Sequence, residues 1–296
     1  MGLKGVMPPM ITPFKENGDV DLDSFLNNLL LWNEQPLSGY LVLGSNSETA
    51  FLSREEKLEL IRLTAEYAGA DRFIMAGTGV ESIRETIELT NDAAKLGADG
   101  ALVLTPGFYK SQMDSEAMIR YFTEIADHAD IPVYIYNVPK FTGINIQTDA
   151  VECLSSHPNI RGIKDSTGDV QRLALFQKFS RDGFDILVGT AGAWYPALTL
   201  GIQGGIHALA NCCPSQCAEV QKLFEQNKWK EARKLYERLL PVNEAVTAVY
   251  GIAGLKYACD LLGYHGGYVR SPLGALKESA KKDIECILKQ AGILNV

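Results

Sequence analysis

Two apolar segments that follow one another in the chain carry side chains suited to acid–base and nucleophilic chemistry. PVYIYNVP at 132–139 carries Tyr136, and IRGIKD at 160–165 carries Lys164. Lysine is seldom buried unless it is paired or used. Desolvation lowers the pKa of an amine, and a neutral amine attacks a ketone to form an imine, through which a neighbouring C–C bond can form or break. A tyrosine beside that imine can carry the protons.

Other polar residues stand at the ends of further apolar segments. The turn GSNSE at 44–48 offers backbone amides that can hold a carboxylate, and Tyr109 and Gly189 follow two more segments. Each residue alone has a simpler interpretation: a rim lysine, a core tyrosine or an ordinary turn. Asp165 and Asp169 are most simply helix N-caps. The coincidence of a turn with free amides, two tyrosines and a lysine favours a catalytic site.

The segments that position these residues alternate between two patterns. Runs of consecutive apolar residues are typical of parallel strands covered on both faces, and they occur at 5–14, 39–44, 73–79, 100–106, 132–139, 160–165, 184–190 and 204–210. Helical patterns lie between them. Those at 53–69 and 82–97 open with Ser53-x-x-Glu56 and Ser82-x-x-Glu85, the residue pattern of a capping box.

A strand–helix unit repeated about eight times predicts an α/β fold, a (β/α)₈ TIM barrel over residues 1–213. The remaining 214–296 is charged and helical and predicts a C-terminal helical domain or extension. A doubly wound sheet is the alternative, but no Gly-x-Gly-x-x-Gly follows the first strand. In a barrel of this kind the chemistry is found at the C-terminal ends of the strands, where Tyr136 and Lys164 stand.

Composition limits the class of function. The chain has 296 residues, 46 % apolar and 22 % charged, with a net charge of −8, which argues against a nucleic-acid surface. No apolar run is long enough to span a bilayer. The six cysteines have neither a disulfide-scaffold pattern nor a zinc spacing, and the four histidines are scattered. We therefore expect reduced cysteines, a local packing role for Cys212, Cys213 and Cys217, a cytoplasmic location and no metal site.

Several motifs together resemble one family. GSNSE, TPGFY, YNVP followed by TG, GIKDSTGD and RSPL are similar, in order and over almost the whole chain, to those of the dihydrodipicolinate synthase / N-acetylneuraminate lyase family of class I aldolases. The resemblance implies a (β/α)₈ barrel with a C-terminal helical extension and a Schiff-base lysine, with no metal or other cofactor. It also implies a 2-keto acid substrate such as pyruvate, an aldehyde partner, and a homotetramer built from tight dimers.

The resemblance also assigns roles residue by residue. Lys164 matches the imine-forming lysine, and Tyr136 the general acid/base. Ser45 and Asn46 match the positions that bind the keto-acid carboxylate through backbone amides. Tyr109 matches the tyrosine that reaches into the neighbouring subunit and completes a proton relay with Ser45 and Tyr136.

Further matches and departures concern the pocket. Gly189 and Ile206 match positions that line it, and Ser166 in KDS would contact the substrate hydroxyl or the leaving carbonyl. Ser47 stands where the family has glycine; because serine tolerates a positive φ poorly, we expect an altered turn. Phe141 stands where the synthase branch has an arginine that binds a substrate carboxylate. The adjacent Lys140 is not expected to replace that arginine, since neighbouring residues point in different directions.

The branch that the sequence most resembles is that of the 4-hydroxy-2-oxoglutarate aldolases, which release pyruvate and glyoxylate. The motifs that favour it include HPNI, GDVQRLA and NEAVTAVYGIAGLK. Three alternatives stay open. The chain is an aldolase or dehydratase of 2-keto-3-deoxy sugar acids, a dihydrodipicolinate synthase, or a catalytically silent barrel that serves as a binding protein.

Overall fold

Eight parallel strands form the centre of the molecule. The structure is a computed structural model that describes residues 2–294. The strands are β1 (Gly5–Met7), β2 (Gly39–Val42), β3 (Phe73–Gly77), β4 (Gly100–Leu104), β5 (Val133–Asn137), β6 (Ile160–Asp165), β7 (Asp185–Val188) and β8 (Gly204–Ile206). Their order in the sheet follows the chain, with β1 paired to β8.

The sheet closes on itself just beyond β1. Pro9 forms an isolated parallel bridge to Leu41 of β2. The amide of Met10 donates to the carbonyl of Leu41 at 2.9 Å, and the amide of Leu41 donates to the carbonyl of Pro8 at 3.0 Å. The predicted (β/α)₈ barrel is therefore confirmed, with the strands somewhat shorter than the apolar runs that predicted them.

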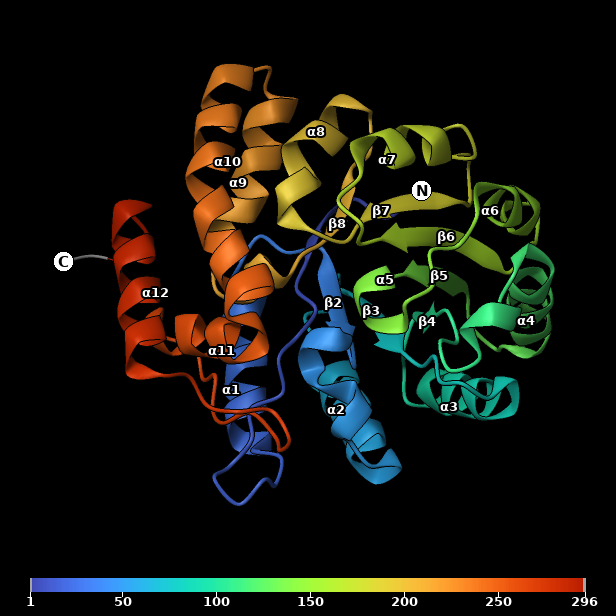
Figure 1. Cartoon of the computed structure of the whole chain (residues 1–296), viewed down its shortest axis with the longest axis horizontal. Coiled ribbons are helices and arrows are strands. Elements are labelled where there is room, and N and C mark those ends of the chain that lie inside the picture. The colour runs from blue at the N-terminus through green and yellow to red at the C-terminus, as the bar shows by residue number, and fades with distance from the viewer. Residues whose placement is uncertain (1, 295–296) are drawn as a thin grey trace.

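Helices connect the strands and form an outer ring (Figure 1). They are α1 (Leu22–Asn33), α2 (Arg54–Tyr67), α3 (Ile83–Lys95), α4 (Ser115–His128), α5 (Pro139–Thr142), α6 (Thr148–Ser155), α7 (Val170–Gln177), α8 (Trp194–Thr199) and α9 (Pro214–Glu225). The predicted capping box is complete at Ser53 and Glu56. Ser82 caps α3 by accepting from the amide of Glu85.

The C-terminal helices gather on one side of the barrel, next to α1 (Figure 1). They are α10 (Trp229–Glu244), α11 (Gly251–Leu261) and α12 (Glu278–Gln290), and a π-helical turn, Ala245–Val249, separates α10 from α11. The predicted boundary at 213/214 coincides with the start of α9. Because α9 packs against both β1 and α10, the division into two domains stays a prediction.

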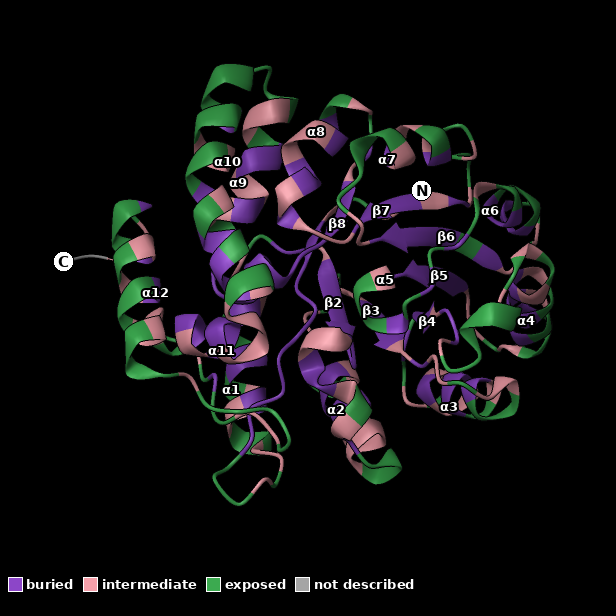
Figure 2. Ribbon diagram, in the orientation of Figure 1, coloured by how far each residue is buried: buried purple, intermediate pink, exposed green. Residues whose placement is uncertain are grey.

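Apolar side chains form one core inside the barrel and a larger one between strands and helices, where Figure 2 shows the buried faces. In β5, Tyr134 and Tyr136 belong to the interior core, whereas Val133 and Ile135 belong to the outer one. Residues paired across parallel strands share a face of the sheet. Lys164, the partner of Tyr136, therefore points into the barrel as well.

The six cysteines are free thiols, as predicted; Cys153 and Cys286 are exposed and the other four are buried. Across residues 2–294 no helix has both the length and the apolar character that a membrane crossing requires.

Candidate active site

The predicted lysine and tyrosine meet at the C-terminal end of the barrel. Tyr136 and Lys164 are directly paired across β5 and β6. The Lys164 Nζ lies 4.2 Å from the centroid of the Tyr136 ring. Both residues are buried, with 2 % of Lys164 and 5 % of Tyr136 exposed. No carboxylate forms an ion pair with Lys164 within the described part of the chain, so burial leaves the amine without a compensating anion.

The surroundings of Lys164 and Tyr136 lower the pKa of both groups. Burial lowers the pKa of Lys164, and the neighbouring Tyr136 only partly offsets that effect. Burial alone would raise the pKa of Tyr136, but the Lys164 ammonium and hydrogen bonds to the Ser45 and Ser166 hydroxyls outweigh it, so the pKa falls below its usual value. A neutral amine is the nucleophile that imine chemistry needs, and a tyrosine with a lowered pKa exchanges protons more readily near neutral pH.

The turn after β2 brings a hydroxyl to this pair. Ser45–Ser47 forms a single 3₁₀ turn, and the Ser45 Oγ lies 3.3 Å from the Tyr136 hydroxyl. The amides of Ser47 and Glu48 donate within the turn, to the carbonyls of Gly44 and Ser45. Those of Ser45 and Asn46 make no hydrogen bond to the rest of residues 2–294, so they are free to bind a ligand.

The altered turn expected at Ser47 stays a prediction, but its stated reason, a positive φ at that position, does not apply in this structure. The left-handed residue is Glu48, with φ 56°, and Ser47 has no positive φ. Ser47 is buried, and its hydroxyl donates to the carbonyl of Met10 at 2.6 Å. Serine thus ties the turn to the segment after β1 instead of straining it.

Glu48 is held from the C-terminal part of the chain. Its Oε1 lies 2.6 Å from the Nζ of Lys256 in α11, and both side chains are almost fully buried. Its Oε2 accepts from the amide of Arg270 at 2.8 Å. The guanidinium of Arg270 in turn bonds to both carboxylate oxygens of Glu56 at the start of α2. A charged network therefore anchors the turn that carries Ser45.

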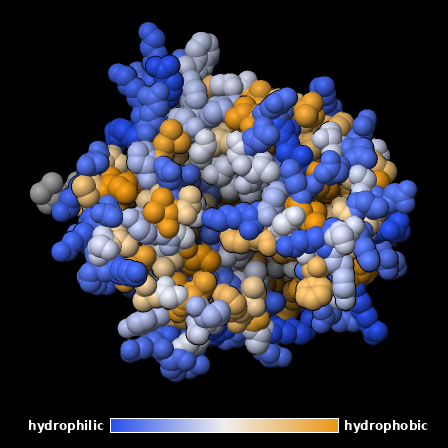
Figure 3. Space-filling view, viewed as in Figure 1, coloured by the Kyte–Doolittle hydropathy of each residue, from blue (hydrophilic) through white to orange (hydrophobic). Residues whose placement is uncertain are grey.

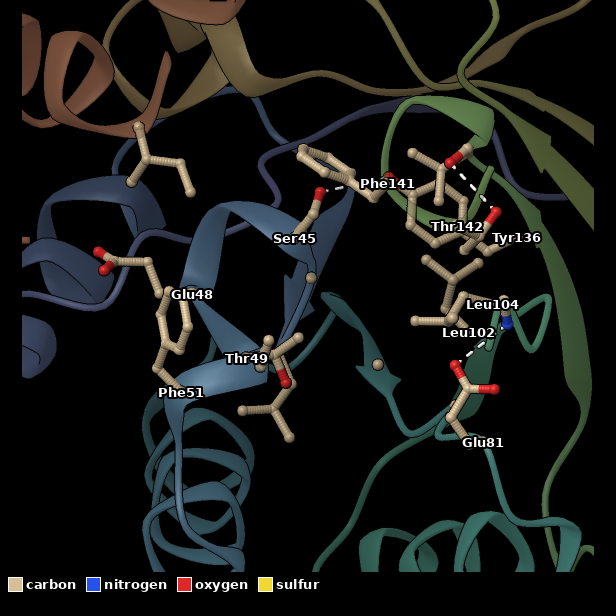
Figure 4. Close-up of a pocket in the computed structure, with 18 of the residues that line it drawn as sticks. Ser45, Glu48, Thr49, Phe51, Glu81, Leu102, Leu104, Tyr136, Phe141 and Thr142 are labelled. Atoms are coloured by element: carbon tan, nitrogen blue, oxygen red, sulfur yellow. Dashed lines mark hydrogen bonds between the residues drawn. The ribbon is translucent and has the colours of Figure 1, made fainter. Parts of the chain in front are cut away.

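Two cavities open at this end of the barrel. One of about 500 Å³ contains Lys164 and is walled by Ser45, Asn46, Phe141 and Ser166. The other, of about 550 Å³, is more apolar and shares Ser45, Tyr136 and Phe141 with the first. Figure 4 shows this second cavity, with Phe141 and Tyr136 on the side that faces Ser45. On the face seen in the space-filling view, hydrophobic patches lie among hydrophilic residues (Figure 3).

Ser166 and Gly189 fit together in the wall of the lysine cavity. The Ser166 Oγ donates to the carbonyl of Gly189 at 3.4 Å. A Cβ added to Gly189 would lie 1.9 Å from that Oγ, so only glycine leaves room for the hydroxyl. Ile206 differs from the expectation: it is buried in the barrel interior, in the core that contains Tyr136. Ala208, two residues further on, lines the cavity instead.

Phe141 lines both cavities and is 58 % exposed. The expectation that Lys140 points elsewhere is wrong, because Lys140 also lines the lysine cavity. The one-turn helix α5 puts both residues on the rim, and the flexible Lys140 side chain reaches the π-helical turn, where its Nζ donates to the carbonyl of Thr247 at 3.0 Å.

Tyr109 does not join the other residues within this chain. It lies in the loop after β4, 66 % exposed, with its ring 5.0 Å from that of Phe108. Glu81 holds the loop, since its carboxylate accepts from the amides of Gly107 and Phe108. Of the three residues expected to form the relay, Ser45 and Tyr136 are in contact within residues 2–294, and Tyr109 is apart from them.

Sequence reasoning misjudged one aspartate and missed part of the cavity wall. Asp169 caps α7 as predicted. Asp165 is instead the buried last residue of β6, which accepts from Asn137 at 2.7 Å and pairs with Arg172 at 3.2 Å. The position of Asp165 directly after Lys164 was the feature of the sequence that could have indicated this buried role. The wall also includes segment 246–253, which only the family resemblance marked.

Metal ligation has no support in the described residues: nowhere in 2–294 do three His, Cys, Asp or Glu side chains come together as metal ligands would.

A closed parallel barrel with a desolvated lysine packed on a tyrosine at its C-terminal end defines a barrel of the lysine-dependent aldolase class. The comparisons with known proteins agree. Residues 2–291 match the model of the dihydrodipicolinate synthetase family. The chain belongs to this family of class I, pyruvate-dependent aldolases.

Relatives of similar length share the whole chain. It is 35 % identical over 296 residues to a 4-hydroxy-tetrahydrodipicolinate synthase of Bartonella tribocorum, covering 99 % of each. It is 34 % identical over 292 residues to one of Thermodesulfovibrio yellowstonii, covering 98 % of this chain and 99 % of the other.

Solved structures of the family superpose closely. A dihydrodipicolinate synthase of Bacillus anthracis matches with a TM-score of 0.92 at 27 % identity, over 98 % of each chain. One of Acinetobacter baumannii, complexed with pyruvate, matches with a TM-score of 0.90 at 32 % identity, over 99 % of this chain and all 100 % of the other.

Proposed function

We propose that this protein is an aldolase of the 4-hydroxy-2-oxoglutarate type, which splits a 4-hydroxy-2-oxo acid into pyruvate and an aldehyde. One observation carries the choice within the family. Phe141, with an apolar ring and no hydrogen-bond donor, walls the lysine cavity where the synthase branch has an arginine. Charge-assisted pairing of an arginine with a carboxylate is among the stronger polar contacts, and this chain does not offer it at that position.

The reaction begins at Lys164. Its neutral Nζ attacks the C2 ketone, and Tyr136 donates the proton with which water leaves, which gives the protonated imine and the Tyr136 phenolate. Tyr136, as phenolate, takes the proton of the 4-hydroxyl while the C3–C4 bond breaks. The bonding electrons move into the imine as an enamine, and C4 leaves as the aldehyde. Tyr136 gives this proton to C3, which restores the protonated imine. Water then hydrolyses the imine to pyruvate and the free amine, and the proton released returns to Tyr136.

The surrounding residues orient the substrate. The free amides of Ser45 and Asn46 hold the keto-acid carboxylate. Ser166, fixed by Gly189 in the cavity wall, hydrogen-bonds the 4-hydroxyl and the carbonyl that it becomes. The Ser45 hydroxyl passes protons to and from Tyr136 across the 3.3 Å contact.

The relay is completed across a subunit contact. Tyr109 is exposed on its loop and enters the site of a neighbouring subunit in a tetramer built from dimers. Mixing Tyr109→Phe and Lys164→Arg subunits therefore restores part of the activity, because mixed dimers contain one site with both native residues. With subunit exchange verified, failure of the mixture to regain activity refutes the shared site.

The second candidate is the synthase reaction, which the names of the relatives favour. Two assays run in parallel decide. Pyruvate released from 4-hydroxy-2-oxoglutarate is coupled to lactate dehydrogenase, and condensation of pyruvate with aspartate semialdehyde is followed separately. We expect cleavage to dominate; condensation faster by orders of magnitude assigns the chain to the synthase branch. A 2-keto-3-deoxy sugar acid in the first assay, with its dehydration product followed as well, tests the remaining enzymatic alternative.

The lysine is tested by trapping. Incubation with pyruvate and borohydride should label Lys164, and Lys164→Arg should fold but lose label and turnover, since the guanidinium stays charged and is not an amine nucleophile. A fully labelled variant, or label mapped to Lys140, rejects this assignment. An unlabelled parent protein would favour the silent binding protein.

A further inference from the structure

The lysine cavity is lined by basic side chains and by no acidic ones. Its walls contain two ionisable side chains that are cationic in water, Lys164 and Lys140, and no carboxylate. Lys164 lies buried at the barrel end, whereas Lys140 is exposed at the rim. Lys164 becomes an imine in the proposed reaction, and the keto-acid carboxylate is assigned to the amides of the Ser45 turn. The charge on Lys140 therefore remains for another anion.

The Lys140 ammonium is held at the cavity wall, but not all of its hydrogen-bond donors are used there. Its Nζ donates one hydrogen bond, to the carbonyl of Thr247 at 3.0 Å. No acidic side chain among residues 2–294 lies within ion-pairing distance of it. An ammonium has three donors, so two remain for a ligand. Thr247, whose carbonyl accepts this hydrogen bond, is itself held in place, because its hydroxyl donates to the carbonyl of Asn243.

The direction of the cavity decides which end of a substrate meets this charge. A 2-keto acid joined through C2 to Lys164 extends away from the buried strand end, toward the rim where Phe141 and Lys140 stand. Phe141 contacts the middle of such a chain with an apolar ring. The Lys140 Nζ lies over that ring, 5.8 Å from its centroid, and so stands next to the apolar surface that such a chain would contact.

From this arrangement we infer that Lys140 is a specificity-determining residue, which binds the distal carboxylate of a dicarboxylic 2-keto acid. The inference rests on the proposed function and names its substrate class: the cleaved acid has a carboxylate at both ends, and the released aldehyde retains one. A neutral hydroxyl at that end, as in a sugar acid, forms a weaker hydrogen bond with the ammonium. The same cavity therefore selects against sugar acids.

The test uses imine trapping, which needs no cleavage and therefore separates this inference from the proposed function. Two probes of equal carbon number are compared, 2-oxoglutarate with a distal carboxylate and 2-oxopentanoate with a methyl group in its place. The concentration that half-saturates borohydride labelling of Lys164 is measured for each. Lys140→Met removes the charge and keeps the length, and Lys140→Arg keeps the charge. Lys282→Met, at an exposed position of α12, removes the same net charge away from the cavity.

We expect the parent protein to prefer 2-oxoglutarate about ten- to a hundredfold, the effect of a hydrogen bond to a charged group. Lys140→Met should lose this preference, because its half-saturating concentration rises for 2-oxoglutarate but not for 2-oxopentanoate. Lys140→Arg and Lys282→Met should keep the preference. Pyruvate should label all of them equally. A preference that survives in Lys140→Met, or a parent that labels with pyruvate but shows no preference, overturns the inference. Absence of any label in the parent refutes the imine mechanism itself.

Discussion

The buried ion pair between Glu48 and Lys256 gives the largest predicted effect on stability. Only 2 % of the Lys256 side chain and none of the Glu48 side chain is exposed. Lys256→Met fills similar space without a charge, so the Glu48 carboxylate stays buried without its cation. Breaking such a pair from one side costs about 3–5 kcal/mol. The substitution also removes the Lys256 Nζ, which donates to the carbonyl of Tyr268 at 2.5 Å in the parent protein.

The assay is urea unfolding followed by circular dichroism, with a matched lysine as control. Lys281 pairs with Glu278 at 2.7 Å, but 35 % and 78 % of the two side chains are exposed, and such pairs contribute about 0–1 kcal/mol. Lys281→Met should therefore unfold almost like the parent protein, whereas Lys256→Met should lose about 3–5 kcal/mol of unfolding free energy.

A double variant separates the pair from the single groups. Glu48→Gln with Lys256→Met leaves no uncompensated charge, so it should cost less than the sum of the two single changes. If Lys256→Met costs no more than Lys281→Met, or if the two single changes simply add, the pair does not hold the turn as we describe.

Three further predictions concern the residues of the candidate active site. Tyr136→Phe should lower the rate of cleavage by about 10²–10⁴; a change below tenfold means another group moves the proton. The pH at which imine formation is half-maximal should lie below the usual pKa of lysine, because burial lowers the pKa of Lys164. Tyr136→Phe should lower this pH further, since Tyr136 partly offsets the effect of burial. A rise of this pH in the variant, measured by borohydride trapping over a pH series, contradicts the predicted direction. Gly189→Ala should displace Ser166 and destabilise the protein by about 1–3 kcal/mol, measured by thermal unfolding, whereas Gly192→Ala, whose added Cβ meets nothing closer than 3.5 Å, should be close to neutral.

The barrel and the central pair could be predicted because they depend on local patterns. Buried parallel strands read as continuous apolar runs, and consecutive strands of a barrel are neighbours. A tyrosine at the end of β5 and a lysine at the end of β6 were therefore predicted to lie side by side, and the register confirms it.

The remaining details depend on contacts between distant parts of the chain. The expectation for Ser47 rested on a backbone angle carried over from glycine, whereas the structure has the positive φ at Glu48 and a hydrogen bond from the Ser47 hydroxyl to the carbonyl of Met10. Lys140 was expected to point away from Phe141, but its long side chain finds the carbonyl of Thr247, more than a hundred residues later. A helix cap was expected at Asp165, but its carboxylate is held by the side chain of Asn137 on the neighbouring strand, 28 residues earlier.

The lysine cavity draws its walls from two separate parts of the molecule. Strand ends of the barrel supply Lys164, Tyr136 and Ser45, while the π-helical turn and the start of α11 supply 246–253. In the proposed reaction the strand ends make and break the bonds, whereas residues of 246–253, together with Lys140 and Phe141 in α5, line the space left for the rest of the substrate. An engineer who wanted another aldehyde partner would therefore vary these two segments and keep the strand ends unchanged.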